Sequence, residues 1–176
     1  MKYRVFLYEK INSVSSDSLI CLSARECRQA FAIDEGTELV VKRSPLGKPY
    51  FEGNPLYVSL SHTENKVILV IADFPVGIDL EKEERALPSE EMQHKLGKKH
   101  FSPAENAEIA RGEIPFLEMW VKKEATVKLT GDGLSGMKST DTENSNIVCL
   151  PVAIPGFICY IAAYGDIAEA ECELYL

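Results

Sequence analysis

Two carboxylates stand at the end of an apolar stretch between residues 76 and 81. The sequence there is Val76-Gly-Ile-Asp79-Leu-Glu81. Because side chains alternate along a strand, Asp79 and Glu81 lie on one face of a predicted strand. An isolated Asp-x-Glu pair is more often the polar end of an edge strand, but a buried strand that ends in acids is expected where a strand meets a cleft.

A third carboxylate and a lysine follow at helical spacing. Trp120, Glu124 and Lys128 are four residues apart, so they form one row along a predicted helix. Alone, the Glu124 and Lys128 pair would be a solvated surface bridge, but Trp120 indicates a face turned toward protein. Carboxylates about 4 Å apart repel by roughly 4 kcal/mol at an effective dielectric of about 20, so a third calls for a hard cation. We predict a magnesium site that binds phosphate, with Asp79, Glu81 and Glu124 as ligands.

Length, charge and cysteine content narrow the class of protein. The chain has 176 residues, 45% of them apolar, which suits one compact unit or two closely packed halves. A formal net charge of −8 argues against nucleic-acid binding, which relies on clustered Lys and Arg. Five spaced cysteines without a C-x-x-C pair indicate reduced thiols. The most apolar internal run, residues 67–76, is too short to span a bilayer, so we expect a cytoplasmic protein that does not bind membranes.

Strands and helices are predicted in a mixed order. Strands are expected at residues 3–9, 37–41, 57–61, 66–72, 76–81, 147–152, 157–163 and 171–176, and helices at 18–31, 88–99, 103–110 and 116–129. Ser102 and Glu105 form a capping box around Pro103, which gives Glu105 mainly a structural role. The polar residues 135–146 are predicted to form a loop beside the site.

Six segments, in order, resemble the motifs of one protein family. They are Gly47-Lys48-Pro49, Ser59-Leu60-Ser61-His62-Thr63, Val76 to Glu81, Phe101-Ser-Pro-Ala-Glu105, Trp120 to Lys128 and Gly131-Asp-Gly-Leu-Ser135. Each is weak alone, but six in sequence are specific. Residues 45–136 thus resemble the 4'-phosphopantetheinyl transferase superfamily, particularly its longer, surfactin-synthetase-activating type, although the amino-terminal half is short for that type. Proteins of this type modify carrier proteins of fatty acid, polyketide and nonribosomal peptide synthesis.

The resemblance implies an α+β fold of two similar α/β halves packed as a pseudo-dimer, with the active site in the cleft between them. Helix and hairpin material in both parts of the chain is consistent with halves at residues 1–72 and 73–176, the second carrying the metal site. Two halves in one chain would remove the need for a partner subunit, so we expect a monomer.

The resemblance also implies an activity. The 4'-phosphopantetheine group of coenzyme A would pass to a serine of an apo acyl or peptidyl carrier protein in a Mg²⁺-dependent reaction that releases adenosine 3',5'-bisphosphate. Glu124 is the expected base, and Lys128 is expected to stabilise charge on the leaving phosphate. Lys123, about a quarter-turn from Glu124 around the helix, is expected to face solvent or contact the carrier protein.

Coenzyme A would meet residues from several segments. Lys48 lies in a rigid Gly-Lys-Pro turn that can aim one ammonium group at a phosphate. By resemblance, Ser61 and His62 contact the nucleotide or phosphate end, while Asp79 and Lys128 lie at the diphosphate.

Two other interpretations stay open. A catalytically silent relative could bind coenzyme A or a carrier protein as a recognition module, although the intact acids and Lys128 argue against it. A metal-dependent phosphodiesterase or nuclease would also use three acids and a lysine, but the sequence shows no obvious basic groove for a nucleic acid.

Overall fold

The computed structural model describes residues 1–10, 13–53, 56–133, 136–140, 142, 146–165, 167 and 171–175. Its elements are β1 (Lys2–Glu9), α1 (Ser16–Glu26), β2 (Val41–Arg43), β3 (Pro49–Phe51), β4 (Tyr57–His62), β5 (Lys66–Ala72), β6 (Val76–Lys82), α2 (Glu90–His100), α3 (Pro103–Arg111), α4 (Phe116–Thr130), β7 (Ile147–Pro151), β8 (Phe157–Tyr164) and β9 (Glu171–Tyr175). The fold is therefore mixed α and β, as predicted.

The strands form two larger sheets and one hairpin within the described residues. One sheet has the order β4-β5-β1-β9 and the other the order β6-β8-β7, while β2 pairs with β3. Neighbouring strands are antiparallel, except that β9 runs parallel to β1. The strand nearest the carboxyl end thus joins a sheet built mainly from the amino-terminal part of the chain.

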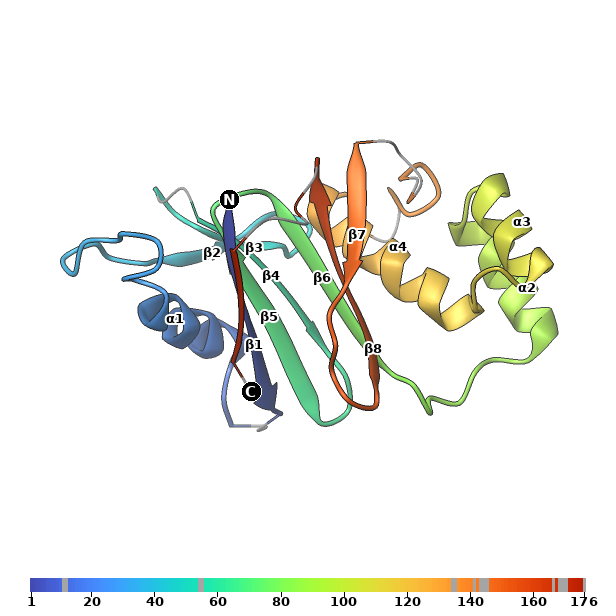
Figure 1. The fold of residues 1–176 in the computed structure, drawn as a ribbon, viewed down its shortest axis with the longest axis horizontal. Coiled ribbons are helices and arrows are strands. Elements are labelled where there is room, and N and C mark those ends of the chain that lie inside the picture. Colours follow the sequence, from blue (N-terminus) through green and yellow to red (C-terminus); the bar gives the residue numbers. More distant parts are fainter. Residues whose placement is uncertain are drawn as a thin grey trace.

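Alternation along β5 explains how the layers stack. Ile68 and Val70 pack into a core shared with β6 and β8, whereas Leu69 and Ile71 pack into a core shared with α1. Both faces of this strand are therefore buried, which accounts for its unbroken apolar sequence. In Figure 1, α1 covers one side of the β1–β5 region, and α4 lies beyond β6 and β8 on the other.

The β6 strand has one apolar and one functional face. Val76, Ile78 and Leu80 point into the core between the sheets. The alternate positions, which include Gly77 and Asp79, face α4. At Gly77, an added Cβ would lie 2.0 Å from the Ala125 carbonyl oxygen and 2.4 Å from the Leu129 amide nitrogen. The missing side chain therefore allows the α4 backbone to approach the strand directly.

The elements before residue 52 differ most from expectation. The first helix begins after Ser15, whose side chain accepts from the Ser18 amide, and it ends at Glu26. The strand predicted at 37–41 is wrong, because β2 starts only at Val41, and β3 was not predicted. Residues 34–37 are held by Arg28, whose guanidinium donates to the carbonyls of Asp34 and Thr37. A side chain thus replaces the ladder of hydrogen bonds that a strand would need.

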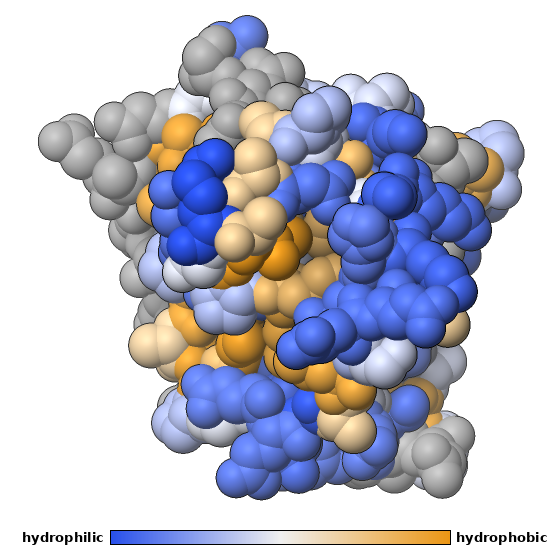
Figure 2. Space-filling model, turned by 90° about the vertical axis from the view of Figure 1, so that its right-hand side faces the viewer, coloured by the Kyte–Doolittle hydropathy of each residue, from blue (hydrophilic) through white to orange (hydrophobic). Residues whose placement is uncertain are grey.

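An apolar hollow lies where α2 and α4 meet. Its lining includes Leu87, Leu96, Phe116 and Trp120. Figure 2, which views the molecule from the side of α2 and α3 in Figure 1, shows apolar side chains gathered in the middle of this face and framed by hydrophilic ones. None of the helices within the described residues combines the length and the apolar character needed to cross a membrane.

Replacing Gly77 with alanine should weaken the fold. The new methyl group meets backbone atoms of α4, which cannot rotate away, so we expect a loss of about 1–3 kcal/mol in the free energy of unfolding. Urea unfolding measures it. Gly36→Ala is the matched control, since an added Cβ there meets nothing within 4 Å. Equal midpoints for both variants and the unaltered protein would contradict the proposed close approach.

Candidate functional site

The candidate site residues line one cavity of about 390 Å³. Its walls come from the loop before β3, from β4, from β6 and from α4. The lining residues are Arg43, Leu46, Gly47, Lys48, Pro49, Ser59, Leu60, Ser61, His62, Asp79, Glu81, Glu124, Val127, Lys128, Gly131 and Gly133. The structure therefore brings together each of the side chains that the sequence singled out for coenzyme, metal or catalysis.

Asp79 lies at the floor of this cavity. It is 2% exposed, and its Oδ1 accepts hydrogen bonds from Ser61 Oγ at 2.6 Å and from Lys128 Nζ at 2.6 Å. Its Oδ2 is buried and has no hydrogen-bond partner among the described residues. Because an unsatisfied buried carboxylate oxygen is costly, this atom is a natural ligand for a cation.

Glu124 faces Asp79 from α4. Burial raises the pKa of Glu124 from 4.5 to about 6, and the nearby charges of Asp79 and Glu81 also raise it. Lys128, with Nζ 4.0 Å from Glu124 Oε2, and a hydrogen bond from Trp120 lower this pKa and so partly offset the increase. Trp120, Glu124 and Lys128 therefore lie along one face of the helix, where Glu124 interacts with both of the others. Excess negative charge in the cavity disfavours ionisation of Glu124, and a cation would relieve it.

The three acids do not form a compact set of ligands in this arrangement. Glu81 is paired with Arg85, and the Lys128 ammonium lies against Asp79. No group of three acidic, histidine or cysteine side chains among the described residues is close enough to hold a metal ion. The unpaired Asp79 Oδ2 and the mutual repulsion of the acids fit a divalent cation, provided that Lys128 and Arg85 turn toward other partners.

Lys48 reaches the site from the opposite wall. Its Nζ donates to the Leu129 carbonyl at 2.8 Å, which caps the end of α4, and burial lowers the pKa of Lys48. The lysine predicted to bind a phosphate thus also ties the amino-terminal wall to α4. His62, at the end of β4, is exposed at the edge of the cavity.

Ser59 is a site residue whose role sequence reasoning missed. Its Oγ accepts from the Ile78 amide at 3.1 Å, while Ser61 Oγ donates to Asp79. These two serines join β4 to β6, which belong to different sheets. The signal was present in the sequence, because two small polar residues at alternate positions of a strand share a face.

Lys123 is not where the sequence placed it. It was expected to face solvent or a carrier protein, but its side chain is 0% exposed and forms an ion pair with Glu105 at 2.7 Å. The reason is that α3 packs against this side of α4. The capping box of Ser102 and Glu105 is confirmed, so Glu105 serves both the start of α3 and the buried pair.

Comparisons with known proteins point to one family. Residues 75–153 match the profile of the 4'-phosphopantetheinyl transferase superfamily. The chain is 34% identical over 107 residues to the 4'-phosphopantetheinyl transferase psf-1 of Bacillus pumilus. This aligned region covers 56% of this chain and 42% of that protein. It is 26% identical over 105 residues to the 4'-phosphopantetheinyl transferase gsp of Aneurinibacillus migulanus, covering 54% and 40%.

A match of greater extent involves the 4'-phosphopantetheinyl transferase AcpT of Salmonella typhi, with 29% identity over 152 residues, 76% of this chain and 77% of that protein. By contrast, the chain spans less than half the length of the psf-1 and gsp proteins that it matches. The matched region contains β6, α4 and the acids that they bring into the cavity. On these grounds the matched region of the chain is similar to the 4'-phosphopantetheinyl transferase superfamily.

Proposed function

We propose that this protein transfers the 4'-phosphopantetheine group of coenzyme A to a serine of an apo acyl or peptidyl carrier protein and releases adenosine 3',5'-bisphosphate. One observation carries the proposal: Asp79, Glu81, Glu124 and Lys128 line the same cavity as Lys48, Ser61 and His62. Three acids and Lys128 on one wall and Lys48 on the other suit a substrate that carries both a diphosphate and a separate phosphate.

The cavity also supports a two-part architecture. One wall comes from β4 and the loop before β3, the other from β6 and α4. We propose that residues 1–72 and 73–176 are two related halves with the active site between them. The order of layers, helix then sheet then sheet then helix, is consistent with this division, and β9 would cross back to pair with β1.

The residues have distinct roles in the proposed reaction. Glu124, whose pKa of about 6 leaves it ionised at neutral pH, accepts the proton of the carrier serine hydroxyl. The freed oxygen attacks the β-phosphorus, and the bond from that phosphorus to the bridging oxygen breaks. Lys128 donates a hydrogen bond to the departing phosphate, for which it would leave Asp79.

A divalent cation, Mg²⁺ by preference, would be held by Asp79, Glu81 and Glu124. When bound, such an ion supplies Lewis-acid stabilisation of the diphosphate charge. Asp79 contributes the buried Oδ2, and Ser61 fixes the carboxylate by its hydrogen bond to Oδ1. His62 and Lys48, at the other wall, would contact the nucleotide end of coenzyme A.

The carrier protein would approach over the apolar hollow. Trp120 lines this hollow and forms a hydrogen bond to Glu124, so one residue of the hollow contacts the proposed base. Leu87, at its edge, is 47% exposed. An apolar surface beside the reacting carboxylate is suited to hold a protein acceptor whose serine must reach Glu124.

The setting of this activity also stays a proposal. We propose a monomer that acts in the cytoplasm, and Cys21, Cys149 and Cys159 are thiols in the structure, as a reducing compartment requires. A silent coenzyme-binding relative remains the principal alternative. The transfer assay described next separates the two.

Transfer is tested by intact-mass measurement of a panel of apo carrier proteins incubated with this protein, coenzyme A and Mg²⁺. We expect one or more carriers to gain the mass of a phosphopantetheine group. Asp79→Ala and Glu124→Ala should reduce the rate by about a hundredfold or more, because they remove a proposed ligand and the base. Glu113→Ala, on the surface, should leave the rate unchanged. Transfer at the normal rate by either cavity variant would refute the assignment.

Ionisation of Glu124 should cost stability in the absence of metal. Its folded-state pKa is about 6 against 4.5 ordinarily, so the folded protein keeps this proton to higher pH than the unfolded chain. The stability of the unaltered protein should therefore fall by about 2 kcal/mol, relative to Glu124→Gln, as pH rises from about 4.5 to above 6.

Urea unfolding with a chelator present, at about pH 4.5 and about pH 7.5, measures this difference. At the higher pH, the Glu124→Gln variant should be more stable than the unaltered protein, and it should be inactive. Glu91→Gln, an exposed change on α2, is the control. An equal stability gap at both pH values would contradict the raised pKa.

Substitution of Leu87 by aspartate should weaken binding of the carrier protein. A charge in the apolar hollow should raise the KM for the carrier by about tenfold and leave the KM for coenzyme A unchanged. Leu22→Asp is the matched control, because Leu22 is 48% exposed on α1, away from the cavity. Steady-state kinetics with each substrate varied in turn gives both constants. An unchanged carrier KM would remove the hollow from the proposal.

A further inference from the structure

A polar cluster that the proposed chemistry does not use lies behind α4. Glu105 and Lys123 are both 0% exposed, and Lys123 Nζ lies 2.9 Å and 2.7 Å from the two oxygens of Glu105. Neither residue lines the cavity. Exchanging a buried ion pair for apolar side chains often leaves stability unchanged or improves it. The role of this pair is therefore sought in the segments that it holds in place.

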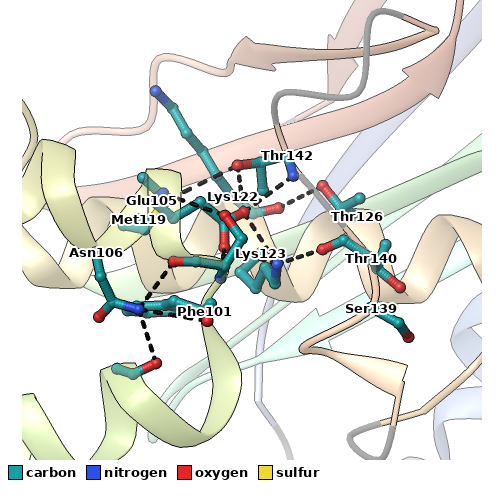
Figure 3. A network of polar contacts seen from close by, with 12 residues as sticks. Phe101, Glu105, Asn106, Met119, Lys122, Lys123, Thr126, Ser139, Thr140 and Thr142 are labelled. Atoms are coloured by element: carbon teal, nitrogen blue, oxygen red, sulfur yellow. Dashed lines mark hydrogen bonds and ion pairs between the residues drawn. The ribbon is translucent and has the colours of Figure 1, made fainter.

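The pair holds the segment that follows α4. Lys123 Nζ donates to the Thr140 carbonyl, and Glu105 Oε1 accepts from the Thr142 amide at 3.0 Å and from Thr142 Oγ1 at 2.6 Å. The other oxygen, Oε2, accepts from the Ser102 amide at 2.7 Å. Figure 3 shows Glu105 from α3 and Lys123 from α4 pointing toward each other, with Thr140 and Thr142 beside them. Three parts of the chain are thus tied at one point.

The held segment is continuous in sequence with a wall of the cavity. Gly131 and Gly133 line the cavity, and they lie against Lys48 and Leu46 of the opposite wall, since an added Cβ would be 3.6 Å from Lys48 Cδ and 3.7 Å from Leu46 Cδ1. Between this wall and the Glu105–Lys123 pair, Met137 is fully buried and the Thr140 amide donates to Gly136 O at 3.1 Å. Residues 134, 135, 141 and 143–145 of the predicted loop lie outside the described residues.

We propose that Glu105 and Lys123, through Thr140 and Thr142, are positioning residues that fix the Gly131–Gly133 wall against Lys48 and so set the affinity for coenzyme A. This inference rests on the proposed function. Both ends of the post-helix segment are fixed: Lys48 holds α4 at the Leu129 carbonyl, and the Glu105–Lys123 clasp holds residues 140 and 142. A wall fixed before the ligand arrives does not have to be ordered on binding.

Thr142→Val tests the clasp without breaking the buried pair. It removes one hydrogen bond to a charged group and keeps the shape of the side chain, so we expect the KM and the Kd for coenzyme A to rise about fivefold to tenfold. The kcat should stay within about twofold, because Glu124 and Lys128 remain in place. Thr142→Ser keeps the hydroxyl and should restore both constants. Ser139→Ala, whose hydroxyl donates to Gly136 O within the same segment, is the control.

A second variant tests Lys123 itself. Lys123→Met combined with Glu105→Gln removes both charges and leaves an amide oxygen for Thr142, which avoids a lone buried charge. Its KM for coenzyme A should rise at least as much as that of Thr142→Val. The temperature is chosen so that circular dichroism shows every variant folded.

The outcomes separate this inference from the proposed function. Titration calorimetry with coenzyme A and Mg²⁺ measures binding directly, and the carrier assay measures transfer. Binding by the unaltered protein with an unchanged Kd in Thr142→Val overturns the positioning role, as does a loss confined to kcat. An unaltered protein that neither binds coenzyme A nor transfers the group overturns the proposed function.

Discussion

The close approach of β6 to α4 is the constraint on which the site depends. The strand has no side chain at Gly77, so the helix backbone lies against it, and a methyl group there would overlap the Ala125 carbonyl. Two residues further along the same face, Asp79 reaches Lys128 at 2.6 Å. Because strand side chains alternate, Glu81 lies on the same face as Asp79, and because Glu124 is one helical turn before Lys128, it faces the same cavity.

Electrostatics gives this geometry its chemical meaning. Three acids gather in one partly buried cavity, and the pKa of Glu124 is raised to about 6 in consequence of burial and of its acidic neighbours. Lys128 neutralises part of the negative charge, but Asp79 Oδ2 has no hydrogen-bond partner among the described residues. The proposed metal would complete the balance, because it can replace the lysine beside Asp79 and free that lysine for a phosphate. The same groups thus account for both the raised pKa of Glu124 and the proposed use of coenzyme A.

Much of this could be predicted from the sequence, since local periodicity decides which residues share a face. The shared face of Asp79 and Glu81 and the helical row that contains Glu124 and Lys128 are of this kind, and the structure brings these four side chains into the cavity. What packs against each face is not a local property. Lys123 was misplaced because its burial depends on Glu105, which arrives with another helix.

The same limit applies at the amino-terminal wall. Lys48 caps α4 across 81 positions of sequence, a contact that no spacing rule encodes. The misplaced strand at 37–41 begins in a segment whose Asp34 and Thr37 carbonyls accept hydrogen bonds from the Arg28 side chain. Local patterns therefore predicted the acidic wall well, while the contacts that close the cavity required the tertiary structure.

We propose that the carboxylates of β6 and α4 share one divalent cation in the presence of coenzyme A. Calorimetric titration of Mg²⁺ into the protein with saturating coenzyme A tests it most directly, in the unaltered protein and in Asp79→Asn. We expect saturable binding of Mg²⁺ that the substitution abolishes. Absence of Mg²⁺ binding to the unaltered protein, or equal binding by both, would contradict it.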